Sequence, residues 1–100
     1  MGPMSLTEST DGEILAILGL RLRKLREARQ FSSGEAAKAA GLSRRTVYRA
    51  ERGLNPTTLT LIRLLRLYGS LDALAAFIPE AEISPMALIR RPARKRTGDG

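Results

Sequence analysis

The sequence has 100 residues, a length that suits one compact domain with a modest core, so we expect a single folded unit with frayed ends. Hydrophobic residues make up 43% of the chain and aromatic residues only 4%, and Leu, Ile and Ala dominate. This composition predicts an all-α fold. The net charge of +7 favours a polyanionic partner, and nucleic acid is preferred over an anionic membrane surface.

The chain contains no cysteine and no histidine. Their absence excludes thiol nucleophiles, imidazole bases, disulfides and the usual zinc ligand sets, so we expect no metal, no cofactor and no catalytic residue. Glu80 and Glu82 are interpreted as solvated acids in a loop. Because no segment approaches the roughly 18 to 20 apolar residues of a membrane span and no signal pattern is present, we expect a cytoplasmic protein that is not an enzyme.

The first two predicted helices follow a polar arm. Apolar residues recur at helical steps and predict a first helix to about Gln30; the stripe consists of Leu15, Leu18, Leu22 and Leu25. A short second helix is expected over 34–40, where Ser32 and Ser33 offer N-caps and alanines replace large side chains. Gly41 then ends this helix in a position that needs a positive φ.

A third helix is expected over 43–52, capped by Ser43 directly after the tight turn. The face predicted to be buried carries Val47, Ala50, Glu51 and Leu54. The opposite face is basic with one aromatic residue, and it comprises Arg44, Arg45, Tyr48, Arg49 and Arg52. The sequence therefore predicts a helix with one apolar side and one side suited to a polyanion.

Two further helices are expected after Pro56. The fourth is capped by Thr57 or Thr58 and carries Leu61, Leu64, Leu65 and Tyr68 at helical spacing. The fifth is capped by Ser70, carries Leu71, Leu74, Ala75 and Ile78, and stops at Pro79. A short helical turn follows Ser84, and residues 90–100 have the composition of a disordered basic tail.

Three features coincide in the centre of the chain: a helix of small residues, a glycine turn and a basic outward face. The small residues let two helices approach closely, and Gly41 permits the bend between them. This is the arrangement of a helix-turn-helix. The N-terminal half of the third helix is then free to enter a DNA major groove, whose width of about 12 Å admits an α-helix.

The segment 31–53 resembles the helix-turn-helix of the XRE family, also called lambda-repressor-like or Cro/C1-type. The resemblance extends over about 18–74 and includes Leu22-Arg23-Lys24-Leu25-Arg26, Glu51-Arg52-Gly53 and Asn55-Pro56-Thr57. It implies a five-helix DNA-binding domain. The chain departs from the family at Ser33, where many relatives have a Gln that supports the first recognition residue, and Gly34 weakens the start of the second helix.

The resemblance also implies a role for each residue of the third helix. Arg44 and Arg45 fall at the base-reading positions of the family, and Arg can bond O6 and N7 of guanine with both arms. Tyr48 either contacts a thymine methyl or sugar or is partly buried. Arg49 reaches either a base or a phosphate.

Phosphate contacts are expected from helix N-termini and short polar side chains. The expected residues are Ser33, Ser43, Thr46, Arg52, Asn55 and Thr57. Arg26 and Glu51 occupy the positions that form an ion pair in the family, which ties the first helix to the third. We expect this pair to have a structural role.

The expected organisation is a flexible arm (1–11), a helix-turn-helix domain (12–79), a dimerisation segment (80–89) and the basic tail. Apolar residues near the end exceed what a domain of this size can bury: Leu71, Leu74, Phe77, Ile78 and Ile83. They predict a homodimer that reads a pseudo-palindromic operator on double-stranded DNA. The tail is either a phosphate-tracking arm or a solubilising end.

The leading hypothesis is a sequence-specific transcriptional regulator, a dimeric repressor that inserts helix 43–52 into the major groove. The alternative rests on a similarity of 57–61, 70–71, 83–85 and the arginine-rich tail to HipB-like antitoxins. That similarity implies a protein that represses its own operon and binds a HipA-type kinase toxin. A protein-interaction adaptor without DNA binding is disfavoured by the arginines of the third helix.

Overall fold

The computed structural model describes residues 6–81 of the chain. It contains four α-helices: α1 (Asp11–Ala28), α2 (Ser33–Ala40), α3 (Arg44–Glu51) and α4 (Thr58–Leu67). Two 3-10 helices, η1 (Leu6–Glu8) and η2 (Leu71–Ala75), flank them, and residues 6–81 contain no strand. The predicted all-α fold is confirmed. The predicted tail and nearly all of the segment 80–89, with the Ile83-Ser84-Pro85 motif of the antitoxin similarity, lie outside the described residues.

The α-helices begin where hydroxyl side chains cap their first N–H groups. Ser32 Oγ accepts a hydrogen bond from Glu35 N at 3.1 Å, and Ser32 N donates to the Glu35 carboxylate at 2.8 Å, which completes a capping box. The Ser43 and Thr57 hydroxyls cap α3 and α4 by accepting hydrogen bonds from Thr46 N and Thr60 N, without the second bond of a capping box. Ser33, the other cap candidate, is instead the first residue of α2.

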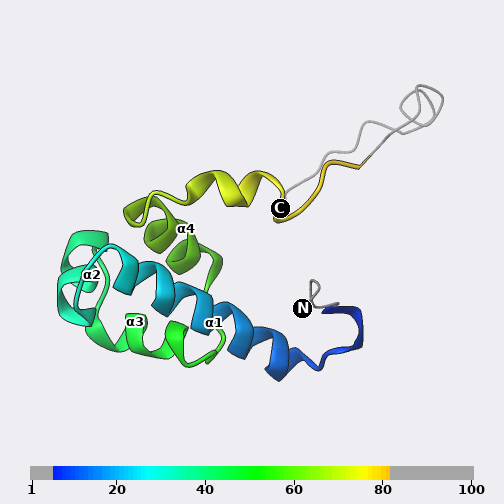
Figure 1. Ribbon diagram of the computed structural model, residues 1–100, viewed down its shortest axis with the longest axis horizontal. Helices are drawn as coiled ribbons and strands as arrows, with labels where there is room; N and C mark the ends of the chain where they lie inside the picture. The colour runs from blue at the N-terminus through cyan, green and yellow to red at the C-terminus, as the bar shows by residue number, and fades with distance from the viewer. Residues whose placement is uncertain (1–5, 82–100) are drawn as a thin grey trace, which may run out of the picture.

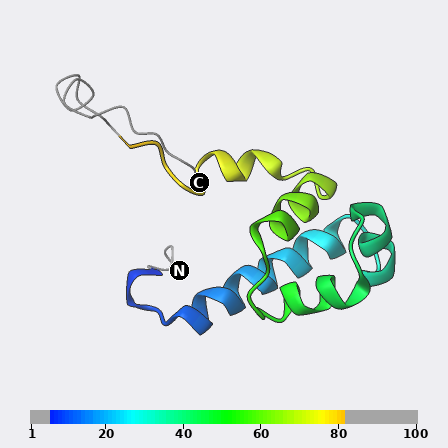
Figure 2. The ribbon, with the colours of Figure 1, turned by 180° about the vertical axis from the view of Figure 1, so that it is seen from behind.

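A three-residue turn joins α2 to α3. Gly41 has a φ of 71°, the left-handed conformation that a glycine adopts without steric cost. Leu42 N donates to Ala37 O at 2.8 Å and thereby closes the C-terminal end of α2. Because α3 starts directly after this turn, α2 closes one end of the molecule and α3 runs back alongside α1 (Figures 1 and 2).

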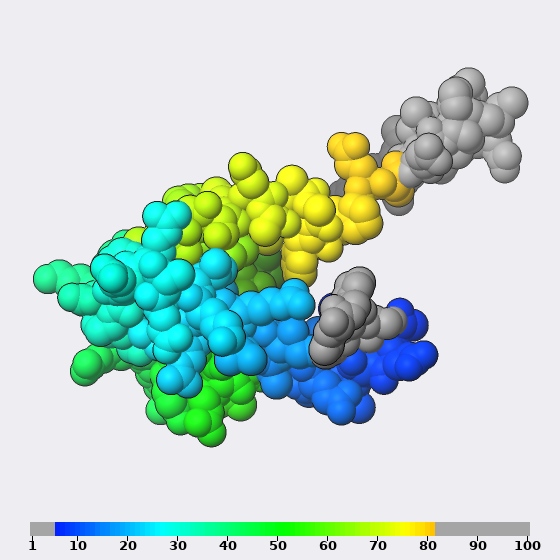
Figure 3. All heavy atoms as spheres, viewed as in Figure 1, coloured from blue at the N-terminus to red at the C-terminus, as the bar shows by residue number. Residues whose placement is uncertain are grey.

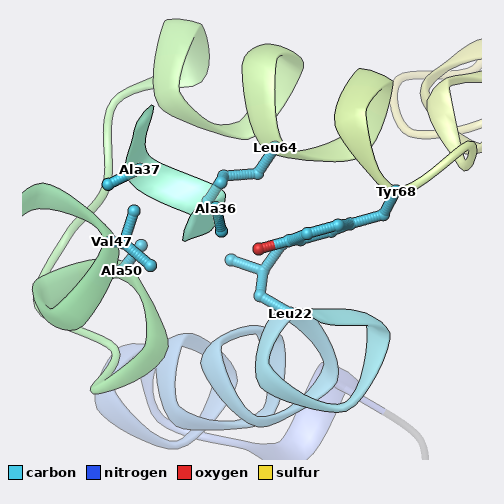
Figure 4. Close-up of a cluster of buried hydrophobic side chains, with 7 residues drawn as sticks. All are labelled: Leu22, Ala36, Ala37, Val47, Ala50, Leu64 and Tyr68. Carbon is cyan, nitrogen blue, oxygen red and sulfur yellow. The ribbon is translucent and has the colours of Figure 1, made fainter. Parts of the chain in front are cut away.

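The buried core is small and is built from every α-helix (Figure 4). Its members are Leu22, Ala36, Ala37, Val47, Ala50, Leu64 and Tyr68. Alanines occupy the contact between α2 and α3, so their backbones lie close together. Val47 is fully buried and fixes α3 to the body of the protein by its inner face.

Glycines allow the backbones of α1 and the end of α3 to approach each other. A Cβ atom at Gly19 would clash with the carbonyl oxygen of Glu51 and lie 2.8 Å from that of Ala50. Gly53, which follows α3 with a φ of 73°, faces α1 in the same way, and a Cβ atom there would lie 2.9 Å from Leu15 O. A side chain at either position would push the two helices apart.

Two expectations about the helices are wrong. The predicted fifth α-helix is the five-residue 3-10 helix η2, because Ser70 makes no side-chain cap hydrogen bond and its ψ of 23° is not the extended value of an N-cap. Leu54, expected in the core, is 44% exposed, because Gly53 turns the chain out of the helix before it. The last described residues, up to 81, extend away from the helices (Figure 3). Within 6–81, the helices are all too short or too polar to cross a membrane.

We predict that Gly19→Ala destabilises the fold by about 3 kcal/mol, since the added methyl group meets backbone that cannot move aside. The matched control is Gly12→Ala on the same helix, where an added Cβ has nothing within 4 Å. It should stabilise the protein by about 0.5 kcal/mol through the lower entropy of the unfolded chain. Urea unfolding of both variants measures the difference, and equal midpoints would contradict the close approach of α1 and α3.

Tyr68 is 1% exposed, and its hydroxyl group points into the core with no hydrogen-bond partner in the described part of the chain (Figure 4). Burial, with a smaller effect from the Glu51 carboxylate, raises the pKa of Tyr68 to about 12 from its usual 10.0. The folded protein therefore keeps this phenol neutral at a pH where the unfolded chain ionises it.

Above pH 10 the unfolded state loses the Tyr68 proton first, so the free energy of unfolding should fall by about 1.4 kcal/mol per pH unit up to about pH 12. In Tyr68→Phe this contribution should disappear, and at pH 7 the variant should be as stable as the wild type or more stable, because no unpaired hydroxyl is buried. Denaturant unfolding across pH tests both statements. Parallel pH curves for the two proteins would show that Tyr68 titrates normally.

Candidate nucleic-acid interface

The two faces of α3 differ sharply in burial. Val47 and Ala50 are buried against the core. The side chains predicted to face outward are all exposed, and they are Arg44, Arg45, Tyr48, Arg49 and Arg52. Tyr48 is 55% exposed, so of its two interpretations the structure places it on the surface and not in partial burial. The outward face of α3 is thus available to a partner.

This outward face carries an uncompensated positive charge. Residues 6–81 contain two ion pairs, Arg23 with Glu27 on α1 and Arg26 with Glu51, and neither uses an arginine of the outward face. Glu51 is the only acid within α3, and Arg26 neutralises it from the inner side. An excess of one sign on an exposed helix face attracts a polyanion and steers its approach.

Arg26 binds two other parts of the chain. Its Nε donates to Glu51 Oε2 at 2.7 Å and its Nη2 to Glu51 Oε1 at 3.1 Å, while its Nη1 donates to Phe31 O at 2.9 Å. The hydrogen bonds that Arg26 donates to Glu51 raise the pKa of Arg26, although burial opposes its charge. Because both side chains are mostly removed from solvent, this pair fixes α1, α3 and the start of α2 relative to one another.

Arg44 lies across the first turn of α2. A Cβ atom placed on Gly34 would lie 3.1 Å from Arg44 Nε and 3.3 Å from its Nη2. The guanidinium group therefore occupies the space that a side chain at position 34 would take. Sequence reasoning treated Gly34 only as a weakness of α2 and missed this contact, because nothing in the sequence pairs position 34 with position 44.

Arg52 and Tyr48 interact on the far end of the outward face. The guanidinium carbon of Arg52 lies 5.5 Å from the centre of the Tyr48 ring, the distance of a cation–π contact. This contact holds the Tyr48 ring beside a positive charge at the surface of α3.

Residues from both ends of the α3–α4 connection meet in one shallow hollow of about 170 Å³. Thr46 and Arg49 line it from α3, and Asn55 and Thr57 line it from the connection and the cap of α4. Asn55 holds a φ of 50°, which brings the chain round between the two helices. The structure therefore gathers one predicted base-reading residue and three predicted phosphate-binding residues in one place.

The remaining predicted phosphate-binding residues lie outside this hollow. Ser43 Oγ lies 2.8 Å from Thr46 Oγ1 and caps α3, so it is next to the hollow. Ser33 lies at the start of α2, and Arg52 is turned towards Tyr48.

Sequence reasoning missed Arg63 as well. Arg63 Nη1 donates to Gly41 O at 2.9 Å and so ties α4 to the turn before α3. Its partner is a main-chain oxygen, for which the sequence carries no signal.

These elements form a helix-turn-helix. It consists of the short helix α2, the turn at Gly41, and α3, whose inner face is buried and whose basic face is exposed. The chain matches the family described as "Helix-turn-helix domain" over residues 17–77, and it belongs to this family. The expectation of an XRE-type helix-turn-helix protein is confirmed.

Two curated relatives carry the name "Putative HTH-type transcriptional regulatory protein". The relative from Methanocella arvoryzae is 45% identical over 53 residues, which cover 53% of this chain and 16% of the relative. The relative from Methanospirillum hungatei is 37% identical over 68 residues, which cover 68% of this chain and 22% of the relative. The match thus spans less than a quarter of each relative. No solved structure matches the chain.

Proposed function

We propose that this chain is a sequence-specific DNA-binding transcriptional regulator that inserts α3 into the major groove of double-stranded DNA. The observation that carries the proposal is the exposed, uncompensated row of arginines on a helix whose other face is buried. A helix of this kind fits the major groove, where arginines recognise guanine. The names of the two relatives support a role in transcription.

Base reading is assigned to the exposed residues of the N-terminal and middle parts of α3. Arg44 and Arg45 begin the helix, and Arg49 follows Arg45 by about one turn, so that these two lie on one side of it. Tyr48 adds an apolar ring for contact with a thymine methyl group or a sugar. A bidentate arginine contact discriminates between bases by about 1 to 3 kcal/mol.

Phosphate binding is assigned to the polar groups on either side of the reading face. Thr46, Asn55 and Thr57 contact one strand from the hollow, and Ser43 lies beside them. Ser33 presents the N-terminus of α2, and Arg52 contacts the backbone beyond Tyr48. These contacts fix the register of the protein on the duplex without selecting a sequence.

A homodimeric repressor is the form of regulator that the exposed apolar surface favours. Phe77 is 50% and Ile78 is 76% exposed, an unfavourable exposure for two large apolar side chains that are neighbours. Phe77 also lines an apolar hollow of about 400 Å³ with Leu74 and with leucines of α1 and α4. A two-fold interface at this surface would present two copies of α3 to a pseudo-palindromic operator.

Selection from a random duplex library, followed by titration over a range of salt concentrations, tests the reading role. Wild type should select a consensus and bind with a steep salt dependence. Arg44→Ala and Arg45→Ala should each relax preference at one base position by about 1 to 3 kcal/mol.

Arg23→Ala is the matched control, because it removes the same charge from α1, where Arg23 is exposed and paired with Glu27. It should leave the consensus unchanged. If wild type selects no sequence, or if all three variants lose affinity equally for every duplex, α3 does not read bases.

For the dimer, sedimentation of Ile78→Glu is informative because the side chain is too exposed for its loss to affect the monomer fold. Wild type should sediment as a dimer at micromolar concentration and Ile78→Glu as a monomer, because a buried charge without a partner opposes association. Leu20→Glu, at an exposed site on α1, should remain dimeric. A monomeric wild type, or an equal effect of both variants, would exclude this interface.

A further inference from the structure

We infer that Gly34 is a positioning residue that sets the direction in which Arg44 reaches, an inference that rests on the proposed function. Arg44 is the first residue of α3, yet its guanidinium group lies over the first turn of α2, against the bare Cα of Gly34. A Cβ atom there would lie 3.1 Å from Nε, 3.3 Å from Nη2 and 3.5 Å from Cζ of Arg44. One edge of the guanidinium group therefore lies against position 34.

No ion pair among the described residues explains this placement. The N-terminus of a helix carries a partial positive charge, which disfavours a cation beside it. Arg44 has no ion-pair partner within residues 6–81 either. The contact is one of shape: the three-residue turn brings the start of α3 beside α2 (Figure 1), and the absent side chain of Gly34 leaves room for the guanidinium group.

Gly34 lowers the stability of α2, and its contact with Arg44 explains why a glycine is present there. Glycine in a helix is less stable than alanine, and Ser33 beside it has too short a side chain to support Arg44 from the first turn. Gly34 instead holds Arg44 by leaving room for it. A long side chain that is already placed loses less freedom when it binds DNA, and the positive end of α2 favours its transfer to an anionic partner.

Gly34→Ala tests this inference, because the added methyl group meets only the far end of a flexible side chain. The variant should fold with an unchanged or higher Tm, since alanine is the better helix former. It should displace Arg44 and reduce discrimination at the base position that Arg44→Ala identifies by about tenfold, the effect of losing part of a bidentate contact. Gly12→Ala, in open space on α1, should leave discrimination unchanged.

The double variant separates positioning from a general effect on α2. If Gly34 acts through Arg44, adding Gly34→Ala to Arg44→Ala should change neither affinity nor consensus. In the free protein, NMR should show contacts between the Gly34 α-protons and the Arg44 side chain.

An equal effect of Gly34→Ala with and without Arg44, or the absence of those NMR contacts, would overturn the positioning role alone. A wild-type protein that prefers no duplex would overturn the proposed function and the positioning role together.

Discussion

The hydrogen-bonded fork of Arg26 is the contact on which the geometry of this domain depends. One guanidinium group binds both oxygens of Glu51 at the end of α3 and the carbonyl oxygen of Phe31 before α2. Desolvation offsets much of the attraction in such a pair, but loss of one partner strands a poorly solvated charge at a cost of about 3 to 5 kcal/mol. The pair therefore adds little net stability over an apolar contact, but neither partner can be lost alone, and together they fix the placement of α3.

The other close contacts of α3 concentrate at the same end of the helix. Gly19 packs closely against the carbonyl oxygens of Ala50 and Glu51, and Gly53 packs against the backbone of α1. The N-terminal end of α3, by contrast, is bound mainly through buried Val47 and through the turn after α2. A helix fixed along its inner face and at its C-terminal end leaves the side chains of its first turns exposed, which is where the proposed reading residues lie.

Local signals in the sequence predict much of this fold. Hydroxyl caps and Gly41 give the ends of α2 and α3 to within a residue, because a cap acts on its own helix. The Arg26–Glu51 position is implied only by family resemblance, since no spacing rule joins residues 25 apart. The helix predicted after Ser70 is present, but its predicted type is wrong, because an α-helix and a 3-10 helix of five residues differ by very few hydrogen bonds. The contacts of Gly34 with Arg44 and of Arg63 with Gly41 O are purely tertiary.

The hydroxyl groups at the proposed interface are not equivalent phosphate donors. Thr57 Oγ1 accepts from Thr60 N and donates its own proton to Thr60 Oγ1 at 3.1 Å, so a bond from Thr57 to phosphate replaces an internal one. Ser43 and Thr46 likewise share a single hydrogen bond between their two hydroxyls, so each pair keeps one further proton to donate. In the α4 pair that proton belongs to Thr60, which is buried, whereas Ser43 is exposed and Thr46 is half-buried. The cap of α3 is thus better prepared for phosphate than the cap of α4. Replacing an internal hydrogen bond by one to phosphate adds little net energy. In the proposed complex the arginines therefore supply most of the affinity, and the hydroxyl groups fix the register on the duplex.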